Sequence, residues 1–148
     1  MSSREAEKQA LLDADVFISY IKGDEMTEHS ERVVKAIMSG RFEACISSML
    51  FDDVITGLRS KGMEISDVIK VILAIASINH TPFPVTSAIA VNALMLYDRH
   101  GGPRRLHYFD AFHVATAKIN DLPMITSDKY IIEHQKELGI KAIDLRTQ

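Results

Sequence analysis

Residues Leu11–Phe17, LLDADVF, decide the fold of this chain. Two leucines end a short apolar run, and the carboxylates of Asp13 and Asp15 follow almost at once. The run is too short for a helix, so it predicts a buried strand that ends at an acidic pair. An acid in this position has two interpretations: it caps the next helix by accepting hydrogen bonds from free backbone N–H groups, or it binds a metal ion. The rest of the sequence has to decide between them.

Further short apolar runs alternate with stretches of helical periodicity along the whole chain. This alternation predicts an α/β fold, a three-layer sandwich in which a central, mostly parallel sheet of about four to five strands carries helices on both faces. The segments NHTPFP (79–84) and RHGGPRR (99–105) are rich in turn-forming residues and are expected to be turns between helices. The expected strands are 11–13, 44–47, 124–126 and 142–145, and the expected helices are 16–21, 27–39, 48–60, 66–79, 87–99, 106–120 and 129–138.

Length and composition predict one globular domain over residues 1–148, since 47% of the residues are apolar and 25% are charged. The net charge of −3 excludes a general positive field, so any nucleic-acid binding has to be local. The lone Cys45 lies in an apolar run and is expected to be a buried residue in a reducing compartment. Residues 1–10 lack an apolar signal stretch and the run 68–78 is too short to span a bilayer, which predicts a cytoplasmic protein that is not in a membrane.

Two segments between the second and third apolar runs, DVIKVILAIASI and SAIAVNALMLY, are apolar nearly all the way round a helix. They predict a helical hairpin over about residues 64–100. A helix of this kind needs burial on more than one side, and a second subunit could supply that cover, so we expect a homodimer interface here. The alternative is that the two helices cover each other and the sheet.

Carboxylates gather where the predicted strands end. Asp13 and Asp128 directly follow strands, Asp53 lies in the first turns of the helix after a strand, and Asp110 lies near the start of another helix. Carboxylates that share one edge of a sheet repel one another unless a cation such as Mg²⁺ or Mn²⁺ neutralises them. Each acid also has a simpler interpretation as a helix cap or a solvated side chain, but four independent caps would have no reason to share one edge.

Four segments carry these acids in order: LLDADVFISYI, ISSMLFDDVITGL, YFDAFHVATA and ITSDKYI. Together they resemble the four acidic motifs of PIN domains, especially the VapC-like toxin ribonucleases, and the resemblance covers nearly the whole chain. It implies an endoribonuclease that hydrolyses RNA with Mg²⁺ or Mn²⁺, acting as the toxin of a type II pair with a cognate antitoxin. It also implies that the catalytic and metal-binding acids are Asp13, Asp53, Asp110 and Asp128, with hydroxyls of Thr126 and Ser127 near the metal.

This sequence departs from the family pattern at Asp53, where the second motif usually carries a glutamate. A side chain shorter by one methylene therefore has to reach the metal. Successive helical residues face about 100° apart, so Asp53 rather than Asp52 is expected to enter the cleft. Asp15 is expected to support the site by orienting a water on the metal, by capping the next helix, or by both.

Further polar residues surround the third motif. Arg104 and Arg105 are candidates for contacts with RNA phosphates, with a solvated loop as the alternative. His107 and His113 flank Asp110 and could suggest a transition-metal site, but six residues place them about 240° apart on a helix, so they are expected to diverge. The resemblance implies that His113 packs in the core or supports a metal ligand.

Two other function classes compete with the nuclease. A catalytically weak or inactive PIN-like interaction module would use the apolar helices as its functional surface. A receiver-like domain would need a lysine at the end of the last strand, which KAIDLRTQ does not supply. The sequence contains no GxSxG motif and no glycine-rich phosphate loop, which argues against serine hydrolases and nucleotide-binding enzymes.

Overall fold

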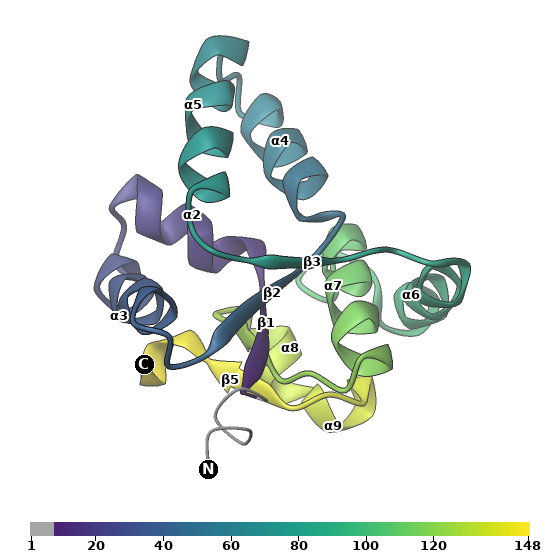
Figure 1. Cartoon of the computed structure of the whole chain (residues 1–148). Coiled ribbons are helices and arrows are strands. Elements are labelled where there is room, and N and C mark those ends of the chain that lie inside the picture. The colour runs from purple at the N-terminus through teal and green to yellow at the C-terminus, as the bar shows by residue number, and fades with distance from the viewer. Residues whose placement is uncertain (1–7) are drawn as a thin grey trace.

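A computed structural model describes residues 8–148 as a parallel sheet with helices around it (Figure 1). The prediction that no signal stretch opens the chain rests largely on residues 1–7, which lie outside the described residues. Within residues 8–148, no helix combines the length and the apolar character needed to cross a membrane. The strands are β1 (Gln9–Leu12), β2 (Glu43–Ser47), β3 (Thr81–Phe83), β4 (Met124–Thr126) and β5 (Ala142–Asp144). The helices are α2 (Ala14–Lys22), α3 (Thr27–Met38), α4 (Leu50–Ser60), α5 (Ile65–Ala76), α6 (Ser87–His100), α7 (Tyr108–Ile119), α8 (Lys129–Glu133), α9 (Gln135–Leu138) and a final 3₁₀ turn, η1 (Leu145–Thr147).

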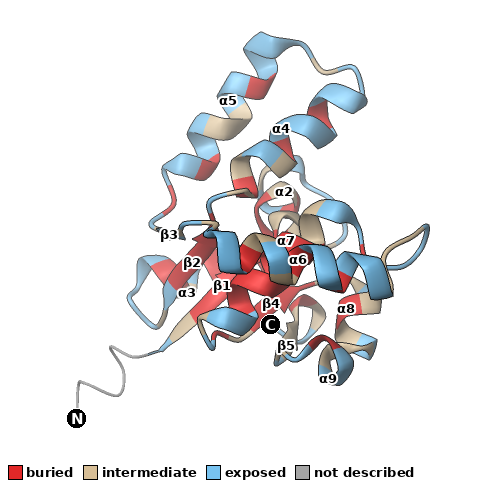
Figure 2. Ribbon diagram, turned by 90° about the vertical axis from the view of Figure 1, so that its right-hand side faces the viewer, coloured by how far each residue is buried: buried red, intermediate tan, exposed pale blue. Residues whose placement is uncertain are grey.

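The five strands are all parallel and follow the order β3-β2-β1-β4-β5. Alternate residues along β1 face opposite layers, as a pleated strand requires. Leu11 packs with α6, α7 and α8, whereas Leu12 packs with α2, α3 and α4, and both are fully buried. Figure 2 shows the same result as buried residues along the sheet and on the inner sides of the helices. The structure confirms the predicted α/β class and its three layers.

One strand was not predicted, because the segment NHTPFP was interpreted only as a turn. Residues Thr81–Phe83 of this segment form β3, which pairs with β2 alone and therefore lies at an edge of the sheet. Pro82 has no N–H to donate, which an edge strand tolerates because one of its sides has no partner strand. The cost of a proline in a strand is small here, so its presence does not exclude a strand.

The expected helical hairpin over residues 64–100 is also wrong. Both helices exist, as α5 and α6, but β3 separates them along the chain. Helix α5 packs against α4, and α6 packs against α7 (Figure 1). Each apolar helix thus covers a different layer, because β3 has to enter the sheet between them. The expected helix over residues 129–138 likewise divides at His134 into α8 and α9.

Candidate metal centre

The central strands β1 and β4 bring the first and last acidic motifs together. From β1 the chain continues toward β2 and β3 on one side, while β4 and β5 lie on the other, so the strand order reverses between β1 and β4. Open parallel sheets bind ligands outside the carboxyl ends of the strands at such a point. Asp13 follows β1 directly, and Thr126, the last residue of β4, donates a 2.7 Å hydrogen bond from Oγ1 to Oδ2 of Asp13.

Helices α4 and α7 add three more side chains to this edge. Asp53 comes from the first turn of α4, and Asp110 and His113 come from α7, where a spacing of three places them on one face. One potential ligand atom from each of Asp13, Asp53, Asp110 and His113 lies within 4.8 Å of the other three. Asp52 is exposed, while Asp53 points inward with 22% of its side chain exposed, as the helical geometry predicts.

The fourth predicted acid, Asp128, lies in a second group that shares Asp110. Atoms of His107, Asp110 and Asp128 also lie within 4.8 Å of one another. His107 Nδ1 is 3.4 Å from Oδ2 of Asp110. The two histidines therefore diverge around α7 as expected, with His113 in the buried group and His107 in the more exposed group. Asp110 is the residue that connects them.

The capping interpretation of Asp13 and Asp128 is correct alongside their place in the cluster. Asp13 is the N-cap of α2 and accepts a 2.7 Å hydrogen bond from the N–H of Ala14. Asp128 is the N-cap of α8 and accepts a 2.8 Å bond from the N–H of Tyr130. A cap uses one carboxylate oxygen, so the two interpretations were never exclusive. The helix starts fix both carboxylates at the edge of the sheet.

Asp15 does not cap α2, because Asp13 holds that position. Its Oδ2 accepts hydrogen bonds from the backbone N–H of Ser127, at 2.8 Å, and from the Ser127 hydroxyl. Arg146 completes this side of the site by donating to the carbonyl oxygen of Ser127 at 3.0 Å and to Asp144 at 3.1 Å. The Ser127 hydroxyl is therefore committed to Asp15, so Asp15 holds the loop that carries Asp128.

Burial and mutual repulsion disfavour negative charge on several of these acids. Burial raises the pKa of Asp110 well above its ordinary value, and the charges of Asp13 and Asp128 raise it further. Burial also raises the pKa of Asp15 to about 7, with Asp13 adding to the effect and the Ser127 hydrogen bonds opposing it. The pKa of Asp13 is raised by burial, although His113 and Thr126 oppose the shift. For His113, burial is the largest effect and lowers the pKa, but the hydrogen bond with Asp53 and the negative charges of Asp13, Asp53 and Asp15 together outweigh it, so the net shift of the pKa is upward.

These properties fit a hard divalent cation. A cation among the carboxylates would relieve the repulsion that raises their pKa values. Oδ1 of Asp15 and Nδ1 of His113 are buried and have no hydrogen-bond partner within residues 8–148, so not every polar atom around the acids is satisfied by the protein itself. Carboxylate oxygens suit Mg²⁺ or Mn²⁺.

A hollow of about 550 Å³ adjoins the acids on the side of Asp15. Its lining combines the acids Asp15, Asp24 and Glu25 with the cations Lys22, Lys61 and Arg146, and sequence reasoning did not assign these three cations to the site. These cations come from three segments that are distant in the sequence, and only the folded chain places them together. The predicted phosphate contact Arg105 donates to the carbonyl of Arg99 at 2.9 Å and lies over the ring of Tyr130, while Arg104 is exposed.

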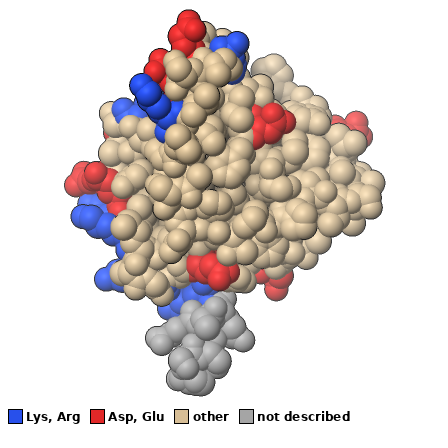
Figure 3. Space-filling model, turned by 45° about the horizontal axis from the view of Figure 1, so that its top comes forward, with Lys and Arg blue, Asp and Glu red and all other residues tan. Residues whose placement is uncertain are grey.

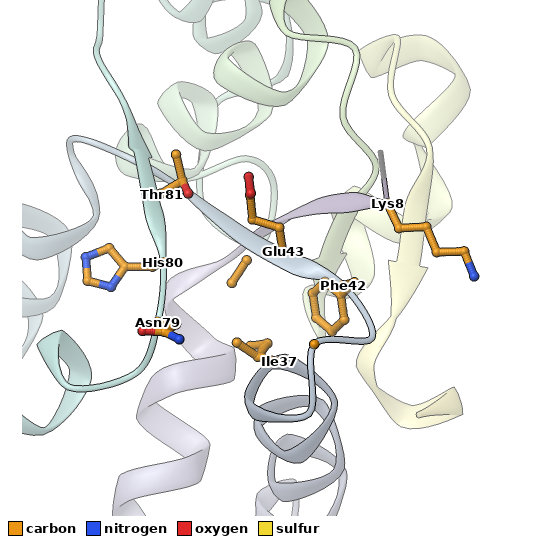
Figure 4. Close-up of a pocket in the computed structure, with 9 residues that line it drawn as sticks. Lys8, Ile37, Phe42, Glu43, Asn79, His80 and Thr81 are labelled. Carbon is orange, nitrogen blue, oxygen red and sulfur yellow. The ribbon is translucent and has the colours of Figure 1, made fainter. Parts of the chain in front are cut away.

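Another hollow, of about 470 Å³, lies at the opposite edge of the sheet, where β1, β2 and β3 begin (Figure 4). Its lining includes one carboxylate, Glu43, which accepts a 2.6 Å hydrogen bond from Gln9. Figure 4 shows that Glu43 and Lys8 point away from each other. This hollow has neither converging acids nor the carboxyl ends of strands, so the acidic edge is the better candidate site.

Comparison of the sequence with protein families gives a match to the model described as PIN domain, over residues 10–137. Comparison with curated proteins gives no match.

Solved structures share the fold at low sequence identity. VapBC2 from Rickettsia felis, bound to a DNA fragment from its promoter, is 11% identical with a TM-score of 0.68, covering 92% of this chain and 98% of that chain. DNA-bound VapBC from Salmonella typhimurium is 20% identical with a TM-score of 0.65, covering 93% and 98%. A toxin–antitoxin complex from Klebsiella pneumoniae is 19% identical with a TM-score of 0.58, covering 82% and 89%.

Proposed function

The chain belongs to the PIN domain family, and from this premise we propose that it is a Mg²⁺- or Mn²⁺-dependent endoribonuclease of the VapC type. The observation that carries the proposal is the cluster at the carboxyl edge of the sheet. Three carboxylates and one imidazole from β1, α4 and α7 approach within 4.8 Å of one another. The proposed domain takes in residues 1–148. The proposed location is the cytoplasm, where the buried thiol of Cys45 stays reduced.

The proposed metal-binding and catalytic residues are the acids of the four motifs. Asp13, Asp53 and Asp110 would hold the ion, with Asp128 on the solvent side of Asp110. A divalent ion bound there supplies Lewis-acid chemistry, which activates a water for in-line attack on the phosphodiester and stabilises the leaving oxygen. Thr126 fixes the Asp13 carboxylate, and Asp15 fixes the Ser127 loop.

The chain would bind the phosphates of its substrate through two groups of cations. One group is Arg104 and Arg105, and the other is Lys22, Lys61 and Arg146, which line the hollow beside Asp15. Lys22 and Lys61 have no carboxylate within 4.0 Å in the described part of the chain, so their charges remain available. Phosphate contacts of this kind position a strand without reading its sequence.

Substitution of the acids tests the nuclease directly. We expect Asp13→Asn and Asp110→Asn each to lower RNA cleavage in Mn²⁺ by more than the roughly 10–100-fold typical of residues that only support a metal ligand. The matched control is Asp52→Asn, because Asp52 is an exposed acid beside Asp53 and should retain activity. Unchanged cleavage in Asp13→Asn and Asp110→Asn would exclude the assignment. A wild-type chain that binds no Mn²⁺ would favour the alternative of an interaction module.

We also propose that the chain forms a homodimer through α5 and α6. Exposed apolar patches of this kind mark protein interfaces. Figure 3 shows few charged side chains on the face over β3 and the helices beside it. We expect Leu73→Lys to give monomers by light scattering, while Met38→Lys, at an equally exposed methionine on α3, leaves dimers; dimers in both variants would refute this interface. The exposed apolar side chains are Ile65, Ile69 and Leu73 on α5, and Val91, Leu94 and Met95 on α6.

The proposed partner is a cognate antitoxin, by analogy with the toxin–antitoxin complex from Klebsiella pneumoniae that shares this fold. Expression of the chain in its host should then arrest growth, and co-expression of a neighbouring small gene should relieve the arrest. If Asp110→Asn still arrests growth, the toxicity does not depend on the nuclease activity.

A further inference from the structure

The contact between His113 and Asp53 links the two helices that bring side chains to the acidic edge. Nε2 of His113 lies 2.8 Å from Oδ2 of Asp53, and the imidazole is fully buried. His113 stands three residues after Asp110 on α7, so both side chains point to the same side of that helix. Asp53 has no other hydrogen bond within residues 8–148 that involves its carboxylate.

The direction of this hydrogen bond follows from chemistry. A carboxylate that binds a metal ion only accepts hydrogen bonds, so with an ion at the acids the proton of the contact belongs to Nε2 of His113. Nδ1 is buried and has no partner in the described part of the chain. An unsatisfied buried polar atom costs about 1–3 kcal/mol. An apolar side chain would fill the same space without that cost, which argues that the donor at Nε2 has a purpose other than stability.

The imidazole limits where the Asp53 carboxylate can go. Asp53 lies on the first turn of α4 and 22% of its side chain is exposed, so without a partner it could rotate toward solvent. His113 engages Oδ2 and leaves Oδ1 without a hydrogen bond within residues 8–148. The donor therefore restrains one oxygen while the other stays free for an ion.

We propose that His113 is a positioning residue that holds the Asp53 carboxylate in place for the metal ion, and that the two residues form a matched pair. A glutamate at position 53 would be longer by one methylene, about 1.5 Å, and would collide with an imidazole that already touches Asp53 at 2.8 Å. The short arm of Asp53 and the imidazole thus share the space between α4 and α7. This inference rests on the proposed function, because it assumes that a divalent ion binds at the acids.

Two variants of similar bulk separate positioning from packing. His113→Leu fills the site but cannot donate, whereas the amide nitrogen of His113→Gln reaches about as far as Nε2 and can donate to Asp53. We expect calorimetric titration of Mn²⁺ into the full chain to show a loss of about 10–100-fold in affinity for His113→Leu and near wild-type affinity for His113→Gln. Val114→Ala, at a neighbouring buried residue, is the control for disturbed packing of α7 and should leave Mn²⁺ affinity unchanged.

Pairing is tested by lengthening the acid. Asp53→Glu should weaken Mn²⁺ binding while His113 is present, and adding His113→Ala, which frees the space, should restore part of the loss. Equal Mn²⁺ affinity in wild type and His113→Leu, or an equal loss in His113→Leu and His113→Gln, would overturn the positioning role. A wild-type chain that binds no Mn²⁺ would instead overturn the proposed function. Failure of the double variant to improve on Asp53→Glu would refute the matched pair alone.

Discussion

Replacement of Asp15 by asparagine should change the stability of the protein in a way that depends on pH. Burial raises the pKa of Asp15 from 3.8 to about 7. One pKa unit corresponds to about 1.4 kcal/mol, so the difference corresponds to at most about 4 kcal/mol. Because the pKa is raised in the folded state, the unfolded chain releases this proton first as the pH increases. The wild-type protein therefore loses stability between about pH 4 and pH 7, while the asparagine variant has no such proton to lose.

At pH 4 the carboxyl group is neutral in the folded state, where its pKa is about 7, and only about half ionised in the unfolded chain, so little of the pH-dependent loss has developed. Asparagine also has nearly the same shape. Its Oδ1 can still accept from the N–H and hydroxyl of Ser127, the contacts that Asp15 makes through Oδ2. We therefore expect nearly equal stability at pH 4 and a gain for Asp15→Asn that rises to at most about 4 kcal/mol at pH 8.

Urea unfolding in the presence of EDTA, followed by circular dichroism from pH 4 to pH 8, measures the difference between the two proteins. The removal of metal is essential, because a divalent cation near the acids would stabilise the charged form of Asp15 and reduce the gain. A difference in unfolding free energy that stays constant across this pH range would refute the reasoning. So would a variant that becomes less stable than wild type as the pH increases.

Three further substitutions test how the site and the loop beside it are held. Thr126→Val removes the donor to Asp13 and the acceptor for the Asp128 N–H, and should lower the free energy of unfolding by about 2–4 kcal/mol in urea at pH 7; a loss below 1 kcal/mol would contradict this. Gly101→Ala places a methyl group against the backbone of Tyr97, so it should displace the loop with Arg104 and weaken RNA binding in a filter assay. Gly57→Ala meets no atom in α4 and should instead add about 0.5–1 kcal/mol of stability while RNA binding is retained.

Much of the fold follows from local sequence patterns. The runs that became β1, β2 and β4 are mostly apolar and buried on both faces, so their lack of alternation identified them. The run that became β5 is only half-buried, and its short length identified it. The strand β3 was not predicted from the sequence, because its three residues are exposed or half-buried and the central one is a proline, a pattern typical of a turn. Its pairing with β2 is a long-range interaction that no local pattern reveals. The error about the hairpin over residues 64–100 followed from this one missed strand.

The residues of the site likewise fall into two groups: those that local sequence patterns identify, and those that only the folded chain brings together. Asp13, Asp53, Asp110 and Asp128 could be found because each stands at a recognisable strand end or helix start. The bond between His113 and Asp53 joins residues 60 positions apart, and a histidine within an apolar helix gives no sign of its partner. The spacing between Asp110 and His113 did place both on one face of α7. Only the packing of α4 against α7 determines which acid that face meets.

The central claim is that the acids at the carboxyl edge of the sheet hold a divalent ion, and anomalous diffraction from crystals soaked in Mn²⁺ tests it most directly. We predict an anomalous peak at coordinating distance from carboxylate oxygens of Asp13 and Asp110, and no such peak in crystals of Asp110→Asn. A peak bound only by other residues, or no peak at millimolar Mn²⁺, would contradict the account.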